Sequence, residues 1–150
     1  METNLARKQG EGLRKIPDEP VMRMHLWFET EDGVVFGLGR LLLLLKVEQC
    51  GSLKAAAEQL GMSYRGAWGK LRRTEELLGH DLVDKGGCRR SGVQLTPYGR
   101  ELARLFSYWY REVEQYALCT STEFLPFHPA AFKNEIPVNT LQPVKNNTLK

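Results

Sequence analysis

The first apolar pattern in the chain has a period of two residues. Apolar side chains recur at every second position from Met22 to Phe28, and Asp32-Gly33 separates them from the apolar run at 34–36. This period is typical of a strand, and an Asp-Gly pair suits the positive-φ turn between two twisted antiparallel strands. The pattern predicts a β-hairpin with its turn at Asp32-Gly33.

The next apolar segment contains five consecutive leucines, residues 41–45, inside a helix expected over residues 40–49. Five leucines in succession cannot all lie on one face of a surface helix, so this helix should be covered on more than one side. It is a central core helix, or it also packs against a second subunit. We expect both roles, and we place three of its leucines in a subunit interface: Leu41, Leu44 and Leu45.

Capping residues mark the ends of two further helices. Ser52 and Ser63 are favourable N-caps, and Gly61 between them can adopt the backbone conformation of a sharp turn. These residues delimit a short helix over 53–60 and a longer one over 63–78. Two helices joined by a short turn that contains glycine predict a helix-turn-helix, although this spacing also fits helix pairs in unrelated cores.

The longer of these helices has an apolar side and a cationic side. The apolar positions are Tyr64, Ala67, Trp68, Leu71 and Leu78, and the opposite side carries Arg65, Gly66, Gly69, Lys70 and Arg73. Each glycine costs about 0.5–1 kcal/mol of helix stability relative to alanine, which close approach of the backbone to a phosphate or groove wall would offset. The alternative is a solvated surface in which Glu75 and Glu76 balance the basic residues, including Arg72. Because both acids lie near the C-terminal end, we favour a nucleic-acid contact at the N-terminal turns.

A second hairpin is expected after the helix-turn-helix. Strands at 82–85 and 93–96 flank a glycine-rich loop that carries Arg89 and Arg90. A basic hairpin at this point in the chain completes the order of elements in a winged helix. Ser52 and Lys54 open the first helix of the motif, where backbone N–H groups can hold a phosphate.

The last predicted helix carries an apolar seam. Thr96 is an N-cap and Pro97 a favourable first residue for a helix that we expect to end at about Leu118. The seam recurs at alternating steps of four and three residues, which is the spacing that suits a partner helix: Leu102, Phe106, Trp109, Val113 and Tyr116. At about 1.5 Å per residue such a helix is about 33 Å long, more than one small core needs, and we expect it to dimerise.

These elements define the expected fold class and its division along the chain. The fold is α+β, mainly α: a winged helix-turn-helix with an N-terminal β-hairpin and a long C-terminal dimerisation helix. Residues 1–20 lack a period and are expected to be a flexible arm, residues 21–118 the domain, and residues 119–150, rich in proline and asparagine, a flexible tail.

Composition sets limits on function but does not assign one. The 150 residues suffice for one domain, and 21 basic against 18 acidic residues give a net charge of +3, which permits an anionic partner. The three cysteines lack metal-ligand spacing, the N-terminal segment is not a signal peptide, and no apolar run approaches the length of about 20 residues that spans a bilayer. We expect a cytoplasmic protein without a membrane association, metal site or cofactor.

The specific part of the sequence is a Ser-Tyr-x-x-Ala-Trp run that begins at Ser63. Together with Gly51-Ser52-Leu53-Lys54, Leu82-Val83, and Leu95-Thr96-Pro97-Tyr98-Gly99, it resembles the N-terminal DNA-binding domain of ModE-type molybdate-responsive regulators, over about residues 21–118. The parts outside that run are shared with the wider LysR-type winged helices. The wing of the family is longer and richer in glycine than the segment Cys88-Arg89-Arg90-Ser91 of this chain.

The resemblance implies a dimer whose first and last helices pair two subunits and whose helix from Ser63 reads the major groove of double-stranded DNA. The implied contacts are Ser63, Tyr64, Arg65, Lys70 and Arg73, with Arg89 and Arg90 of the wing beside them. We add Ser52, Lys54 and Gly66 to this set from the residues themselves, and we expect the site to be an inverted repeat. Full-length members bind molybdate in C-terminal domains that the segment after Thr120 cannot form, so molybdate is not expected as a ligand.

Two alternatives from other classes remain. An enzyme is disfavoured because His25, His80 and His128 have no mutual ligand spacing and no nucleophile motif surrounds Ser63 or Cys88. Cys88 could act as a redox sensor if the neighbouring arginines lower its pKa, although a lone cysteine is more often incidental. A winged-helix protein-interaction module without DNA readout is the second alternative, and salt dependence separates it from a DNA reader because an apolar interface resists added salt.

Overall fold

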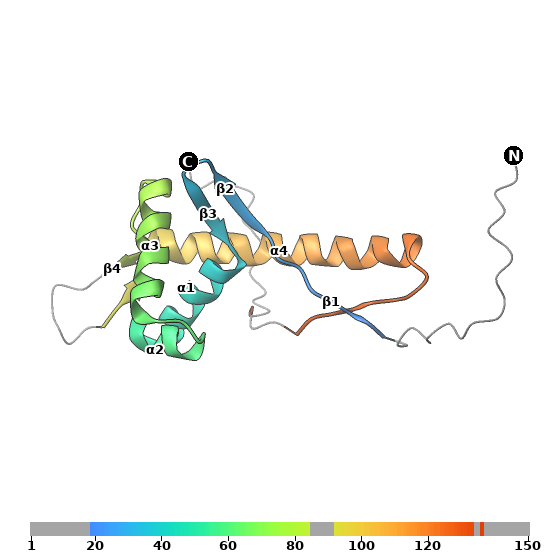
Figure 1. Ribbon diagram of the computed structural model, residues 1–150, viewed down its shortest axis with the longest axis horizontal. Coiled ribbons are helices and arrows are strands. Elements are labelled where there is room, and N and C mark those ends of the chain that lie inside the picture. Colours follow the sequence, from blue (N-terminus) through green and yellow to red (C-terminus); the bar gives the residue numbers. More distant parts are fainter. Residues whose placement is uncertain (1–18, 85–91, 134–135, 137–150) are drawn as a thin grey trace, which may run out of the picture.

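The computed structural model describes residues 19–84, 92–133 and 136, and four helices dominate them (Figure 1). A short helical cluster lies at one end of a much longer helix. The elements in chain order are β1 (Val21–Met22), β2 (Trp27–Thr30), β3 (Gly33–Gly37), α1 (Leu38–Cys50), α2 (Leu53–Gln59), α3 (Tyr64–Leu78), β4 (Val83–Asp84), β5 (Gln94–Leu95), α4 (Pro97–Phe124) and β6 (Ala130–Ala131).

Helix α1 forms the centre of the core. It packs against α2, α3 and α4 and against strands β3 and β5. Leu41, Leu43, Leu44 and Val47 are all 0% exposed, while Leu42 and Leu45 are partly buried against the core. The expectation that the leucine run is covered on several sides is therefore confirmed within one chain.

This burial corrects the placement of Leu41 and Leu44 in a subunit interface. Neither side chain has any surface that a second copy could contact without unfolding the core. The sequence pattern could not separate the two roles, because burial by neighbouring helices and burial by a second subunit require the same apolar side chains. Leu45 stays partly accessible.

A polar contact fixes α3 across α1. Thr74 of α3 is fully buried, and its Oγ1 accepts a hydrogen bond of 2.9 Å from Nε of Arg40. Burial lowers the pKa of the Arg40 guanidinium from its ordinary value. A buried hydroxyl without a partner is costly, so this bond stabilises one orientation of α3 against the core.

The predicted N-terminal hairpin is present as β2 and β3, but its turn differs from the prediction. Thr30 pairs with Gly33, so the turn residues are Glu31 and Asp32. Gly33 has a positive φ of 129°, whereas no described residue other than glycine has a positive φ, so Asp32 does not adopt the expected conformation. Residues 21–22 do not belong to this hairpin, because β1 pairs with β6 instead.

Strands β4 and β5 form the base of the second predicted hairpin. They pair antiparallel, with Val83 opposite Leu95. The backbone N–H of Val93 donates to the carbonyl of Gly51 at the α1–α2 turn, at 3.0 Å. Gly92 has a φ of 68°, and a Cβ on it would collide with that same carbonyl, so only glycine fits this close approach. The wing loop itself, residues 85–91, lies outside the described residues.

Helix α4 begins as predicted and ends later than predicted. Thr96 accepts the capping bond from the N–H of Gly99 at 2.9 Å, and Pro97 is the first helical residue. The helix continues to Phe124 instead of ending at about Leu118, and at about 1.5 Å per residue it is about 42 Å long. The apolar period fades after Thr120, but this last stretch contains no proline or glycine that would break a helix.

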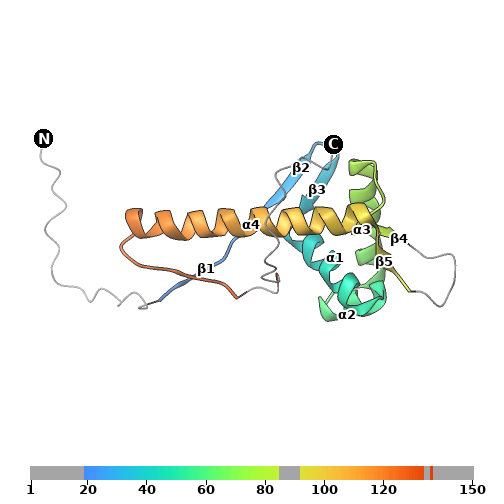
Figure 2. The same cartoon turned by 180° about the vertical axis from the view of Figure 1, so that it is seen from behind.

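The chain after α4 returns beside its own N-terminal part (Figure 2). Strand β6 pairs in parallel with β1, with Val21 opposite Ala130. The guanidinium of Arg23 lies 3.9 Å from the centre of the Phe132 ring. The tail expected from residue 119 is therefore helical to Phe124 and strand-paired at 130–131. The division of the chain into arm, domain and tail stays a prediction. Of the predicted arm, residues 1–18 lie outside the described residues.

Candidate nucleic-acid interface

The turn between α2 and α3 has the geometry of a helix-turn-helix. Ser52 accepts a capping bond from the N–H of Ala55 at 3.3 Å, and Ser63 accepts one from the N–H of Gly66 at 3.0 Å. Between the helices Gly61 has a φ of 65°, and the N–H of Met62 donates to the carbonyl of Ala57 at 3.0 Å. Both N-caps and the glycine turn predicted from the sequence are confirmed.

Helix α3 turns one side to the core and the other to solvent. Ala67, Leu71 and Thr74 are buried. The exposed positions include four that form a basic surface with a glycine in its middle: Arg65, Gly69, Lys70 and Arg72. Within the described part of the chain, no carboxylate or hydrogen-bond acceptor contacts the Arg65, Lys70 or Arg72 side chain. This basic surface of α3 is the candidate interface.

Arg72 is the basic residue that the predicted set of contacts omitted. It stands seven residues after Arg65, close to two full helical turns, so the two arginines share one side of α3. The seven-residue spacing in the sequence is the signal that identifies Arg72 as a candidate contact.

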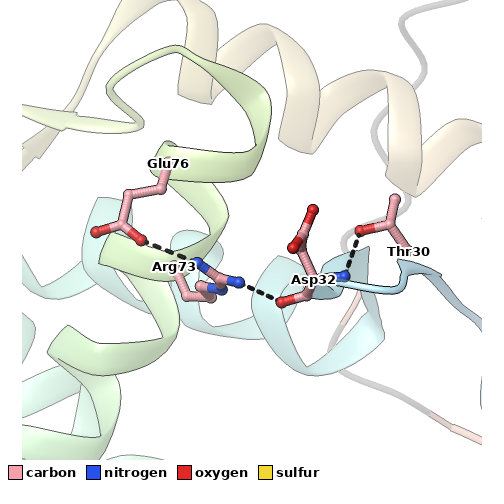
Figure 3. A network of polar contacts seen from close by, with 4 residues as sticks. All are labelled: Thr30, Asp32, Arg73 and Glu76. Atoms are coloured by element: carbon pink, nitrogen blue, oxygen red, sulfur yellow. Dashed lines mark hydrogen bonds and ion pairs between the residues drawn. The ribbon is translucent and has the colours of Figure 1, made fainter.

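Arg73 has a different role from the other basic residues of α3 (Figure 3). Its guanidinium donates to the backbone carbonyl of Asp32 at the β2–β3 turn and forms a 3.3 Å ion pair with Glu76. The N–H of Asp32 in turn donates to Thr30. Arg73 therefore connects α3 to the β2–β3 hairpin, and its guanidinium is directed toward the hairpin turn.

The helical position of Tyr64 predicted that its side chain lies in the core, but the side chain is exposed. Its residue is 51% exposed, and its ring meets the ring of Trp68 edge to face at 6.2 Å. Tyr64 is the first residue of α3, and the buried side of the helix begins one turn later, at Ala67. Exposure at this end of the helix leaves Tyr64 available to a partner.

The two glycines of α3 differ in their surroundings. A Cβ on Gly66 would lie 3.0 Å from Oγ of Ser63, the hydroxyl that caps the helix. The tight space beside this cap therefore explains the glycine at position 66. A Cβ on Gly69 would meet no atom of the protein within 4 Å. Gly69 lies on the exposed side among the basic residues, and the fold does not require it.

We expect Gly69→Ala to separate folding from binding. The free energy of unfolding should rise by about 0.5–1 kcal/mol, because alanine is the better helix former in open space. Affinity for duplex DNA should fall, because the added methyl group lies where a groove wall would approach. Chemical denaturation and a DNA titration of the same preparation measure the two effects. Unchanged DNA affinity in the stabilised variant would show that nothing approaches α3 at this position.

The remaining predicted contacts lie in two places. Lys54 is exposed at the start of α2 beside the partly buried Ser52, whose hydroxyl caps the helix. Arg89, Arg90 and Cys88 fall within residues 85–91, outside the described residues. The base of the wing, β4 and β5, lies beside the N-terminal end of α4 and close to α3 (Figure 1).

The predicted dimer seam on α4 divides into buried and exposed parts. Phe106 is 6% exposed and packs with Phe36 at a ring distance of 5.0 Å, so it belongs to the core of one chain and not to an open interface. Leu102 and Val113 are partly buried. Trp109 is 38% exposed and Tyr116 73% exposed. The β2 residues Trp27 and Phe28 are exposed as well, and Phe28 contacts Trp109 at 5.2 Å.

The described residues contain neither a metal-binding group nor a membrane-spanning helix. Across residues 19–84, 92–133 and 136, no three His, Cys, Asp or Glu side chains form a group that could hold a metal ion. No helix in the described part has both the length and the apolar character needed to cross a bilayer.

The part of the chain that contains the helix-turn-helix matches the sequence model of a known protein family. The model of bacterial regulatory helix-turn-helix proteins of the lysR family matches residues 38–100, from the start of α1 to the first turn of α4. These residues match a LysR-type helix-turn-helix domain. The resemblance stated from the sequence is confirmed for this segment, which is narrower than the 21–118 expected. The family that this model describes consists of bacterial regulatory proteins.

Relatives of the LysR-type domain include ModE proteins. Molybdenum transport protein ModE of Azotobacter vinelandii is 32% identical over 80 residues, which are 52% of this chain and 30% of that protein. The DNA-binding transcriptional dual regulator ModE of Escherichia coli (strain K12) is 35% identical over 69 residues, 45% of this chain and 26% of that protein. The chain thus spans less than a third of the length of these curated relatives.

Among solved structures, the crystal structure of the BenM DBD/benA site 1 DNA complex is similar, with a TM-score of 0.49 and 23% sequence identity. The similarity covers 59% of this chain and 96% of that chain.

Proposed function

We propose that this chain is a sequence-specific, double-stranded DNA-binding transcriptional regulator that acts in the cytoplasm. The observation that carries the proposal is the basic surface of α3 on a LysR-type helix-turn-helix: Arg65, Lys70 and Arg72 are exposed, and no described residue neutralises them. In a helix-turn-helix the second helix enters the major groove, and its N-terminal residues contact base edges. Helix α3 takes this role, with the β4–β5 wing on the flanking backbone.

The proposed contacts follow from the positions of the side chains. Arg65 and Tyr64 lie in the first turn of α3 and are assigned to base edges. Lys70 and Arg72 lie farther along the same helix and are assigned to phosphates. The remaining proposed contacts are Ser52, Lys54, Ser63 and Gly66, with Arg89 and Arg90 of the wing. Arg73, held by Asp32 and Glu76, is assigned to positioning α3.

A selection of binding sites from random duplexes tests the function. The full chain should enrich one sequence family, and the affinity for it should fall steeply with added salt, because phosphate contacts release counterions. A control with Arg65, Lys70 and Arg72 all replaced by alanine should fold, since these side chains are exposed, and should enrich nothing. A folded wild-type chain that enriches no duplex even at low salt would contradict the proposal.

We propose further that two chains pair through the exposed side of α4. Trp109 and Tyr116 on α4 and Trp27 and Phe28 on β2 leave aromatic surface open to solvent, and such surface is typical of interfaces. A symmetric dimer would place two α3 helices about 34 Å apart or a multiple of it, so the selected site should be an inverted repeat.

We expect Tyr116→Asp to weaken dimerisation without harming the fold. The side chain is 73% exposed in one chain, so its replacement affects little inside that chain, whereas a buried charge at an interface is costly. Sedimentation analysis should show a dimer dissociation constant raised about tenfold or more. Gln115→Asp adds the same charge at the neighbouring exposed position and should leave the dimer intact. Equal behaviour of the two variants would place the interface elsewhere.

The winged-helix protein-interaction module remains the second candidate. The exposed aromatic residues of β2 and α4 favour it, if they contact a different protein instead of a second copy. Binding that persists at high salt and does not depend on Arg65 would support this alternative. No molybdate site is proposed, because the names that mention molybdenum belong to proteins of which this chain spans less than a third.

A further inference from the structure

A cavity of about 390 Å³ lies between the helix-turn-helix and α4. Its walls come from α1, the end of α2, α4, the segment between β1 and β2, and Phe132 and Lys133, which directly follow β6. Leu42, Leu60, Met24 and Phe132 give it an apolar lining. This volume and lining fall in the range of sites for small molecules, which are mostly apolar with a few polar groups that fix orientation.

The polar groups on the α4 wall are hydrogen-bond acceptors. Glu114 lines the cavity, and no described residue forms an ion pair or hydrogen bond with its carboxylate. The Tyr110 hydroxyl donates its only proton to the Met24 carbonyl in a 2.9 Å bond, and its side chain is 1% exposed, so it has almost no surface to offer a ligand. The Glu114 carboxylate is therefore the acceptor that a ligand can reach, and it suits a group with N–H donors.

The electrostatics of this wall also favour a positive charge. Burial raises the pKa of Glu114, and burial together with the charge of Glu114 raises the pKa of Tyr110. A cation bound beside the carboxylate would relieve this cost, because an opposite charge favours the ionised form. A protonated primary amine supplies this charge together with N–H donors for the carboxylate.

Basic side chains in the lining limit how much positive charge a ligand can carry. Arg23, His25 and Lys133 also line the cavity and are exposed. The Arg23 guanidinium is held over the ring of Phe132. A second ammonium group on the ligand would meet the positive charges of Arg23 and Lys133, whereas an apolar body would lie against Leu42, Leu60 and the Phe132 ring. The lining therefore selects one amine on an apolar body.

We propose that this cavity binds a small molecule with a single primary amine and an apolar body, with the ammonium group on the Glu114 carboxylate. Leu60 is the C-cap residue of α2, so a bound ligand contacts the helix-turn-helix directly. An effect of the ligand on DNA affinity rests on the proposed function, whereas binding of the ligand does not.

Calorimetric titration of the full chain with chosen amines tests the proposal. The probes are hexylamine and 2-phenylethylamine, and their controls are 2-phenylethanol, phenylacetate and the diamine cadaverine. The amines should bind with a dissociation constant of about 1 mM or tighter, and each control about tenfold more weakly or worse. Absence of amine binding at about 10 mM, or equal binding of amine and alcohol, would overturn the proposal.

A matched pair of variants locates the amine. Glu114→Gln keeps the size of the side chain and removes its charge, and it should weaken amine binding about tenfold or more. Glu112→Gln, at an exposed position of α4 outside the cavity lining, should leave amine binding unchanged. Thermal melting checks that both variants fold. Amine binding that survives in folded Glu114→Gln would overturn the assignment.

A DNA titration with and without 2-phenylethylamine separates the two proposals. If the amine binds and no duplex is bound, the proposed function fails while the cavity assignment stands. If duplex binding occurs but no amine binds, the cavity assignment fails and the DNA-binding function stands.

Discussion

Arg65→Ala is expected to weaken binding of the preferred duplex by about 1–3 kcal/mol, which is about 5- to 150-fold in the dissociation constant. Arg65 lies in the first turn of α3, is exposed, and has no partner among the described residues. An arginine in this position reaches the edge of a guanine with two hydrogen bonds, and alanine removes both. Titration of the selected duplex and of a scrambled duplex measures the loss of discrimination.

The control for Arg65→Ala is a variant that removes an equal charge elsewhere. Arg100→Ala does so on α4, where the exposed Arg100 pairs with Glu48 at 2.9 Å. This surface pair contributes little to stability, so the control should fold and should keep its preference between the two duplexes. If Arg65→Ala weakens both duplexes equally, Arg65 contacts a phosphate and another residue reads the bases.

Leu44→Ala is expected to lower the free energy of unfolding by about 2–5 kcal/mol. Leu44 is 0% exposed in the middle of α1, so truncation removes buried methyl groups and leaves a cavity that the surrounding helices cannot fill. The total free energy of unfolding of a small domain is about 5–15 kcal/mol, so this loss should be evident in urea denaturation followed by circular dichroism.

Leu45→Ala is the matched control for Leu44. It is the same substitution at the next position, where the side chain is only partly buried, and its cost should be clearly smaller. A Leu44→Ala protein that keeps its stability and loses only its dimer would contradict the assignment of Leu44 to the core of a single chain.

Features set by neighbouring residues were predictable from the sequence. Ser52, Ser63 and Thr96 each cap a helix through an N–H three residues ahead, and Gly61 and Gly79 take positive φ at the ends of α2 and α3. Such contacts depend on sequence distance alone, so the order of the helices and of the wing strands followed from the capping residues and the apolar periods.

Features set by distant residues were not predictable. Strands β1 and β6 are two residues each and join parts of the chain that lie far apart, so no local period marks them. Arg73 had the same helical side as Lys70, and only the position of the hairpin turn shows that its guanidinium is held. Leu44 and Phe106 had the spacing of an interface, and only the packing of α1 against α4 shows that one chain buries both.

The β2–β3 hairpin makes the two proposed interfaces mechanically dependent on each other. At one end the ring of Phe28 rests on Phe106 and Trp109 of α4, and at the other the carbonyl of Asp32 is fixed to Arg73 of α3. The hairpin thus connects α4 to α3, in addition to the packing of both helices on α1. A partner that displaces the hairpin at Trp109 would strain the contact of Arg73 with the Asp32 carbonyl.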